Sequence, residues 1–174
     1  LVTPVAGAQE PPAGDSYEFL LAKLAADAGS FDEAVTLLDQ IIEKAPGNPV
    51  LLFERAMVLI DAGRVEKAES ELRRVAETNP DFVDARRILG RLLLERAGAD
   101  RARMEEALRH LQAAFKAHPD DLASGVTVSQ LLVALNRTAE AERVLSQLVE
   151  RSPDQRVLNY NYAQVLTKLG RGDE

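Results

Sequence analysis

A period of 34 residues runs through this chain and constrains its fold more than any other feature. Three kinds of position repeat at this interval: two places for a small residue and one for proline. The pairs are Ala34 and Ala68, Pro46 and Pro80, Ala56 and Gly90, Ala107 and Ala141, Pro119 and Pro153, and Ser129 and Ala163. A fixed period of this length is typical of helical solenoids, in which each repeat packs against its neighbours. The pattern favours a binding or scaffolding surface over catalysis.

Composition and charge exclude several classes of function. The chain has 174 residues and no cysteine, which excludes disulfides and cysteine-ligated metals. Its formal net charge of −7 argues against nucleic-acid binding, because affinity for phosphate comes from clustered lysine and arginine. No apolar run reaches the ~18 residues that indicate a membrane-spanning helix. We therefore expect no nucleic-acid partner and no membrane span in this chain.

The N-terminus resembles the end of a secretory signal peptide. Ala6-Gly7-Ala8 matches an A-x-A cleavage site, with a short apolar run before it and the polar Gln9 after it. Pro11-Pro12 and Gly14 then indicate a flexible linker. We expect residues 1–14 to be a signal-peptide remnant and linker, and the protein to be exported to the periplasm or outside the cell. A cytoplasmic protein with an ordinary Ala/Gly/Pro-rich leader is the alternative.

Each period predicts two amphipathic helices joined by a tight turn. The apolar stripe of the first helix is Phe19, Leu20, Leu21, Leu24 and Ala25. This spacing predicts a helix over residues 16–28, after which Gly29 provides the left-handed turn. Ser30 and Glu33 match a capping box that would begin the second helix, and Pro46 ends it. The period therefore predicts an antiparallel helix pair as the repeating unit.

The period divides the rest of the chain into similar units. They cover residues 15–48, 49–82, 83–121 and 122–155, followed by a partial unit over 156–174. The third unit has 39 residues, with the additional ones near 96–103, and Asp100 is the expected N-cap of its longer second helix. Asn136 replaces the turn glycine in the fourth unit. Asparagine is the next-best residue for that conformation.

The pattern resembles the tetratricopeptide repeat (TPR) family over residues 15–174. The matching positions are Ala22, Ala56, Gly90, Ser129 and Ala163 in the first small slot, Ala34, Ala68, Ala107 and Ala141 in the second, and Pro46, Pro80, Pro119 and Pro153. The resemblance implies an all-α, right-handed superhelical solenoid of antiparallel helix pairs, with four complete repeats and a C-terminal half repeat. Small slots mark close helix contacts, so leucine should be tolerated far less at Ala68 than at Ala114, which lies outside the repeating phase.

Motifs for catalysis are missing from the sequence. It contains no HExxH, no GxSxG and no phosphate-binding glycine loop, and His110 and His118 lack a clustered set of metal ligands. We expect no enzymatic activity, no cofactor and no metal. The resemblance to bacterial-type exported TPR proteins implies a non-catalytic scaffold that binds a peptide segment or a partner protein. The alternative is a TPR arm of a larger enzyme whose catalytic domain lies outside this chain.

The resemblance also implies where a ligand would bind, on the concave face formed by the first helix of each pair. The candidates at the family's peptide-binding positions are Phe19, Lys23, Phe53, Met57, Arg87, Arg91, Gln130, Tyr160, Asn161 and Gln164, with Lys168 further along. The family's carboxylate clamp is not supported, because Glu54, Asp84 and Ile88 occupy three of its places.

The character of these candidates changes along the chain. Phe53 and Met57 would form an apolar platform, and Arg87 and Arg91 a cationic one a unit later. Such a surface suits a peptide with hydrophobic anchors and acidic flanks. In the alternative interpretation, both arginines pair with acidic residues on their own helix.

Overall fold

The computed structural model describes residues 16–172, and this part of the chain contains nine α-helices and no strand. The helices are α1 (Ser16–Asp27), α2 (Phe31–Lys44), α3 (Pro49–Asp61), α4 (Val65–Thr78), α5 (Val83–Glu95), α6 (Arg101–Ala117), α7 (Leu122–Ala134), α8 (Thr138–Arg151) and α9 (Arg156–Lys168). The all-helical prediction is confirmed. The expected signal-peptide remnant and linker, residues 1–14, lie outside the described residues, so export remains a prediction.

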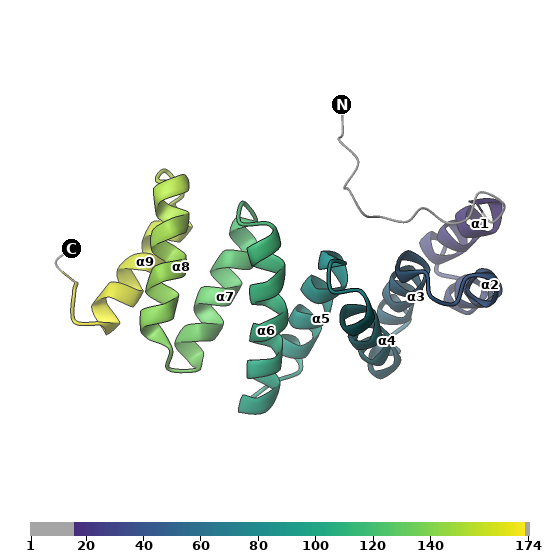
Figure 1. Ribbon diagram of the computed structural model, residues 1–174, viewed down its shortest axis with the longest axis horizontal. Coiled ribbons are helices and arrows are strands. Elements are labelled where there is room, and N and C mark those ends of the chain that lie inside the picture. The colour runs from purple at the N-terminus through teal and green to yellow at the C-terminus, as the bar shows by residue number, and fades with distance from the viewer. Residues whose placement is uncertain (1–15, 173–174) are drawn as a thin grey trace. The chain divides into compact units, whose positions relative to one another are not determined.

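The chain divides into two compact units, one ending at Ala85 and the other starting at Arg86. In the first unit α1 packs on α2, α2 on α3 and α3 on α4. In the second unit α6 packs on α7, α7 on α8 and α8 on α9. Figure 1 shows the paired helices within each unit. Contacts between successive helices are what a repeat protein requires, because each repeat completes the core of its neighbour.

The turns inside the helix pairs have the conformation that the sequence predicts. Gly63 has φ +73° and Asn136 has φ +63°, both in the left-handed region. After each of them, a backbone N–H returns to the helix before the turn: Arg64 N donates to Leu59 O, and Arg137 N to Leu132 O, both at 2.8 Å. This is the Schellman arrangement, which satisfies carbonyl groups at the helix end. Asn136 therefore adopts the left-handed backbone conformation that glycine adopts in the equivalent turns.

The predicted capping box at Ser30 is wrong. The Ser30 side chain makes no capping hydrogen bond to α2. A capping box requires the Ser30 N–H as donor to Glu33, but that N–H already donates to Ala25 O at 2.8 Å in the turn after α1. Ser30 also has ψ 60°, outside the extended region typical of an N-cap. The three-residue turn leaves no residue for a separate cap.

Longer connections do allow side-chain caps, and here the prediction for Asp100 is confirmed. Asp100 accepts hydrogen bonds from the backbone N–H groups of Ala102 at 2.9 Å and Arg103 at 3.2 Å. The extra residues of the third unit are shared between this connection and the helix after it. Helix α6 has 17 residues, whereas α2, α4 and α8 each have 14.

The two small-residue slots lie in close, buried contacts between helices. Ala56 and Ala68 are fully buried, as is Ser129. A Cβ atom at Gly90 would lie 2.7 Å from Leu111 Cγ and 3.2 Å from Ala107 O, so the α5–α6 contact requires glycine. The exception is Ala163, which is exposed because no helix follows α9 among the described residues.

The expected tolerance of Ala114 is not supported. Its side chain is only 2% exposed, so it belongs to the core and offers no open space for leucine. Ala107, Leu111 and Ala114 follow the spacing i, i+4, i+7, which places all three on one buried face of α6. A second helix can pack against the helix on either side, as α2 packs on α1 and α3 and α8 packs on α7 and α9. The buried face of such a helix is wider than the recurring small slot indicates.

The apolar stripe expected for α1 is only partly buried. Ala22 and Ala25 are buried, but Leu20 and Leu24 are each 55% exposed. One period later, Leu51 and Val58 replace Tyr17 and Leu24, and both are buried in α3. Helix α3 packs on the helix before it, whereas the described residues contain no helix before α1. The outer side of α1 is therefore an apolar surface.

Candidate functional site

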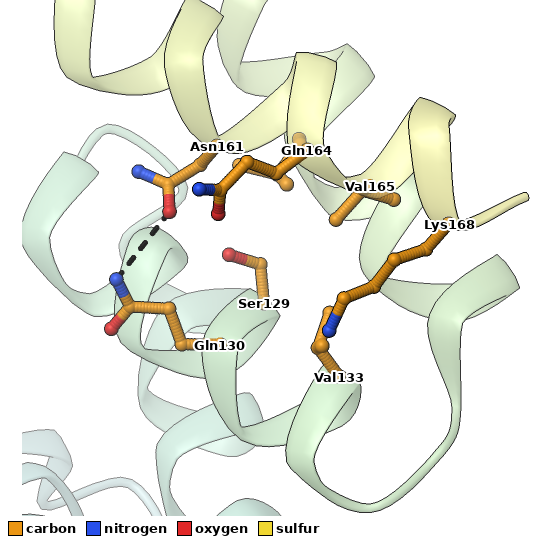
Figure 2. A pocket seen from close by; sticks show the side chains of 8 residues that line it. Ser129, Gln130, Val133, Asn161, Gln164, Val165 and Lys168 are labelled. Atoms are coloured by element: carbon orange, nitrogen blue, oxygen red, sulfur yellow. Dashed lines mark hydrogen bonds between the residues drawn. The ribbon is translucent and has the colours of Figure 1, made fainter. Parts of the chain in front are cut away.

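A cleft between α7 and α9 brings together several of the predicted ligand-binding residues within the second unit. Its volume is about 120 Å³. The lining residues are Ser129, Gln130 and Val133 from α7, Leu145 from α8, and Asn161, Gln164, Val165 and Lys168 from α9. Figure 2 shows the polar side chains of both helices meeting across the opening. The structure thus places four of the predicted positions, including Lys168, around one cleft.

Helical spacing explains why α9 contributes half of the lining. Asn161, Gln164, Val165 and Lys168 follow the spacing i, i+3, i+4, i+7, which places them on one face of α9. On α7, Gln130 directly follows the small slot at Ser129. The small slot lets α8 pack closely behind α7, and the residue after it reaches toward the next first helix.

Hydrogen bonds hold one side of the cleft in place. Gln130 Nε2 donates to Asn161 Oδ1 at 3.5 Å, and Asn161 Nδ2 donates to the Val157 carbonyl oxygen at 2.7 Å. Both ends of the Asn161 amide are therefore engaged. Gln164 makes no side-chain hydrogen bond to any residue that the structure describes, so its amide can both donate and accept.

The floor of the cleft is apolar apart from one hydroxyl. Leu145 and Val165 are buried, and Val133 is half-buried. Ser129 is 1% exposed, and its hydroxyl donates to the Val126 carbonyl oxygen at 2.7 Å, which satisfies the buried donor. The site therefore combines an apolar floor with an amide-rich rim.

Lys168 supplies the charge of the cleft. Its side chain is exposed, and it forms no ion pair with any residue from 16 to 172. Figure 2 shows it extending along the cleft wall toward Val133. Helix α7 contains no charged residue, and α9 contains Arg156 and Lys168 but no acidic residue. The cleft is therefore favourable to an anionic group.

Two predicted residues of the first unit are paired with each other and with a neighbouring helix. Lys23 Nζ lies 3.2 Å from both carboxylate oxygens of Glu54 on α3, and 5.5 Å from the centroid of the Phe19 ring. Glu54 was not predicted as a partner of Lys23. The interval from Lys23 to Glu54 is 31 residues, the same as from Gln130 to Asn161, and this shared interval is a signal that could have found it.

The predicted apolar platform is half-buried. Phe53 and Met57 are both partly covered, and the Phe53 ring lies 5.3 Å from the Phe82 ring, at an interplanar angle of 58°. This tilted arrangement is favourable for aromatic pairs. Phe82 was not among the predicted site residues, because it lies in a connection rather than on a first helix.

The predicted arginines differ from each other. Arg87 is half-buried and lies near Asp121. Burial raises the pKa of the Asp121 carboxyl group, but hydrogen bonds from Ser124 and the charge of Arg87 outweigh burial, so that pKa is lowered. Arg91 is exposed and forms no ion pair within residues 16–172, so for Arg91 the alternative of pairing with an acidic residue on its own helix is not found. Whether the arginines lie beside Phe53 and Met57 remains a prediction, because the two pairs belong to different units.

Tyr160 is the most exposed of the predicted aromatic residues, at 65%, and it does not line the cleft. No group of three potential metal ligands occurs among the described residues. None of the helices in that part of the chain has the length and apolar character needed to cross a bilayer.

Comparison with known proteins relates this helical architecture to one family of repeat proteins. The profile described as "Tetratricopeptide repeat" matches residues 25–92 and 99–159. A TPR repeat-containing protein of Pseudomonas aeruginosa is 32% identical over 126 residues, which is 72% of this chain and 21% of that protein. DnaJ homolog subfamily C member 3 of Bos taurus is 26% identical over 123 residues, which is 71% of this chain and 23% of that protein. The chain thus spans less than a quarter of these relatives.

Solved structures show the same fold at low identity. The structure "MamA 41-end" from Desulfovibrio magneticus RS-1 aligns with a TM-score of 0.72 at 15% identity, covering 94% of this chain and 90% of that one. MamA AMB-1 aligns with a TM-score of 0.73 at 19% identity, covering 92% of this chain and 85% of that one. At these identities the likeness concerns the fold alone.

Proposed function

Because this chain belongs to the tetratricopeptide repeat family, a family of protein-interaction scaffolds, we propose that it binds a peptide segment of a protein partner at the cleft between α7 and α9. The observation that carries the proposal is the set of uncommitted polar groups at this opening. Gln164 and Lys168 project into it without partners among the described residues. A peptide backbone presents both donors and acceptors, and a carboxamide side chain can satisfy both.

The alternative of a TPR arm in a larger enzyme keeps the same binding site. It is favoured by one observation: the chain covers only 21% of the curated Pseudomonas relative and 23% of the Bos taurus one, so a protein of this kind can carry much more than these repeats. In that case the bound segment would belong to a substrate or to a neighbouring domain. The lining residues contain no cysteine, histidine or paired carboxylates that could act on it.

A peptide-display experiment tests the proposal. A random peptide library displayed on phage is selected against the immobilised chain, and the affinity of selected peptides is measured by fluorescence anisotropy. In the variant Asn161→Ala/Gln164→Ala, affinity should fall about tenfold or more, because the uncommitted Gln164 amide is lost and the Asn161 amide no longer links α7 to α9 beside it.

The matched control is Gln40→Ala/Gln147→Ala, which removes two exposed amides on α2 and α8. That variant should bind like the parent chain. Equal affinity for all three proteins, with equal melting temperatures, would place peptide binding elsewhere on the molecule.

A further inference from the structure

We infer that the α7–α9 cleft accepts one glutamate side chain of the bound segment, which anchors that segment to the scaffold. The inference rests on the proposed function and narrows it to a stated chemistry. It follows from the size of the cleft, the nature of its walls and the sign of its charge.

The size of the cleft admits a side chain but not a length of peptide. Its volume is about 120 Å³. Pockets for drug-sized ligands have volumes of about 300–1,000 Å³, several times larger. The rest of a bound segment would lie outside it, across the exposed faces of α7 and α9.

The walls suit a side chain with an apolar stem. Val133, Leu145 and Val165 supply aliphatic surface, and the polar groups lie toward the opening and along one wall. Methylene groups gain free energy on leaving water for such a surface. Glutamate has one methylene more than aspartate, so its carboxylate reaches further along the wall while its stem covers aliphatic surface.

The charge of the cleft selects an anion. Lys168 follows Gln164 by four residues, so the ammonium group and the amide N–H donors belong to the same face of α9. No acidic residue lies among the lining residues, and Lys168 has no ion-pair partner in the part of the chain that the structure describes. A carboxylate would meet donors without competition, whereas a lysine or arginine of the partner would be repelled.

The test is a double-mutant cycle on peptides selected by phage display. Selected sequences should share a recurrent glutamate, and they are synthesised with acetylated N-termini and amidated C-termini so that only side chains carry charge. Replacing that glutamate by glutamine should weaken binding to the parent chain about tenfold, the scale of a charge-assisted hydrogen bond. Against Lys168→Met, the same replacement should change affinity by less than about twofold, because the charged partner is absent.

Two further variants separate this role from a general effect of charge. Lys168→Arg keeps the cation and should retain the glutamate preference. Lys116→Met removes one exposed lysine from α6, away from the cleft, and should behave like the parent chain. Peptides with a free C-terminal carboxylate and no internal acid provide the other source of an anion, and they should bind no better than their amidated forms.

The outcomes distinguish this inference from the function on which it rests. If peptides bind and Asn161→Ala/Gln164→Ala weakens them, but no glutamate recurs, the site stands and the glutamate anchor is wrong. The anchor is also wrong if replacing the peptide glutamate by glutamine weakens binding to Lys168→Met as much as it weakens binding to the parent chain. If no peptide is selected at all, both the proposed function and the anchor fall.

Discussion

Gln130 on α7 donates a hydrogen bond to Asn161 on α9, and the two residues are 31 positions apart. Lys23 on α1 and Glu54 on α3 are joined across the same interval. Asn161 lies three residues before Gln164, which is the equivalent of Gln130 one period later. In both pairs, the residue directly after the first small slot contacts a side chain on the next first helix. That side chain lies three residues, about one helical turn, before the position that is equivalent to the first residue one period later. This register sets which side chains of successive first helices can act together.

The first small slot should respond to bulk only where a second helix packs on it. Ala56→Leu places a larger side chain in a fully buried position and should lower the free energy of unfolding by about 1–3 kcal/mol. Ala163→Leu changes the equivalent but exposed position of α9 and should stay within about 0.5 kcal/mol. Urea denaturation of both variants provides the comparison. Similar losses would show that the slot does not mark the close contact.

Gly90 should not accept even a methyl group without loss. Its Cβ would lie 2.7 Å from Leu111 Cγ and 3.2 Å from Ala107 O, and the backbone oxygen cannot rotate away. We expect overpacking in Gly90→Ala to lower the free energy of unfolding by about 1–3 kcal/mol. The better helix propensity of alanine would offset up to about 1 kcal/mol of this loss. Gly47→Ala is the control, since no atom lies within 4 Å of its Cβ position. Thermal unfolding followed by circular dichroism measures both, and a stabilised Gly90→Ala would contradict the close α5–α6 contact.

The turn between α7 and α8 should distinguish three residues by backbone conformation alone. Asn136 has φ +63°, which costs an ordinary L-residue about 1–2 kcal/mol. Asn136→Ala should therefore lower the melting temperature, whereas Asn136→Gly should preserve or raise it. An alanine variant as stable as the glycine variant would mean that the turn relaxes out of the left-handed region.

Acid should weaken the start of α7. In the folded state burial raises the pKa of Asp121, but hydrogen bonds from Ser124 and the charge of Arg87 outweigh it, so the pKa is lowered. The folded chain thus binds this proton less readily than the unfolded one. Its contribution to stability is complete above the ordinary aspartate pKa of about 3.9 and is lost as pH falls through the lower folded value.

Asp121→Asn should therefore reduce the fall in unfolding free energy below about pH 4, because the titrating group is gone. Urea unfolding at a series of acidic pH values measures that slope. The control Asp120→Asn removes one exposed carboxyl group next to it. If Asp121→Asn and the parent chain lose stability with the same slope, the Asp121 carboxyl group makes no such contribution.

The sequence predicted the repeat and its helix pairs because the small slots follow from sterics. Where two helices approach closely, only small residues fit, and Ala56, Gly90 and Ser129 keep that restriction whatever surrounds them. The left-handed turn at Asn136 was predictable for the same reason, since few residues adopt that conformation. These features depend on local geometry and therefore leave a trace in the spacing of residues.

The candidate site was predictable only as a set of separate positions. The sequence placed Gln130, Asn161 and Gln164 on first helices, but their meeting in one cleft depends on the rotation of α9 relative to α7. The same dependence hid the pairing of Lys23 with Glu54. The missing cap at Ser30 has another cause, because its N–H is taken by the preceding turn. In each case a distant or competing partner decided the outcome.

The extra residues of the third unit all precede Ala107, so the spacing from Ala107 to Pro119 equals that from Ala34 to Pro46. The added length lies in the connection after α5 and the first turn of α6, where Gly98 and Ala99 are exposed. This connection is thus a natural attachment point. A fluorophore or an affinity tag attached at Ala99 would lie outside the helix contacts, whereas Ala97 two residues earlier is part of the core.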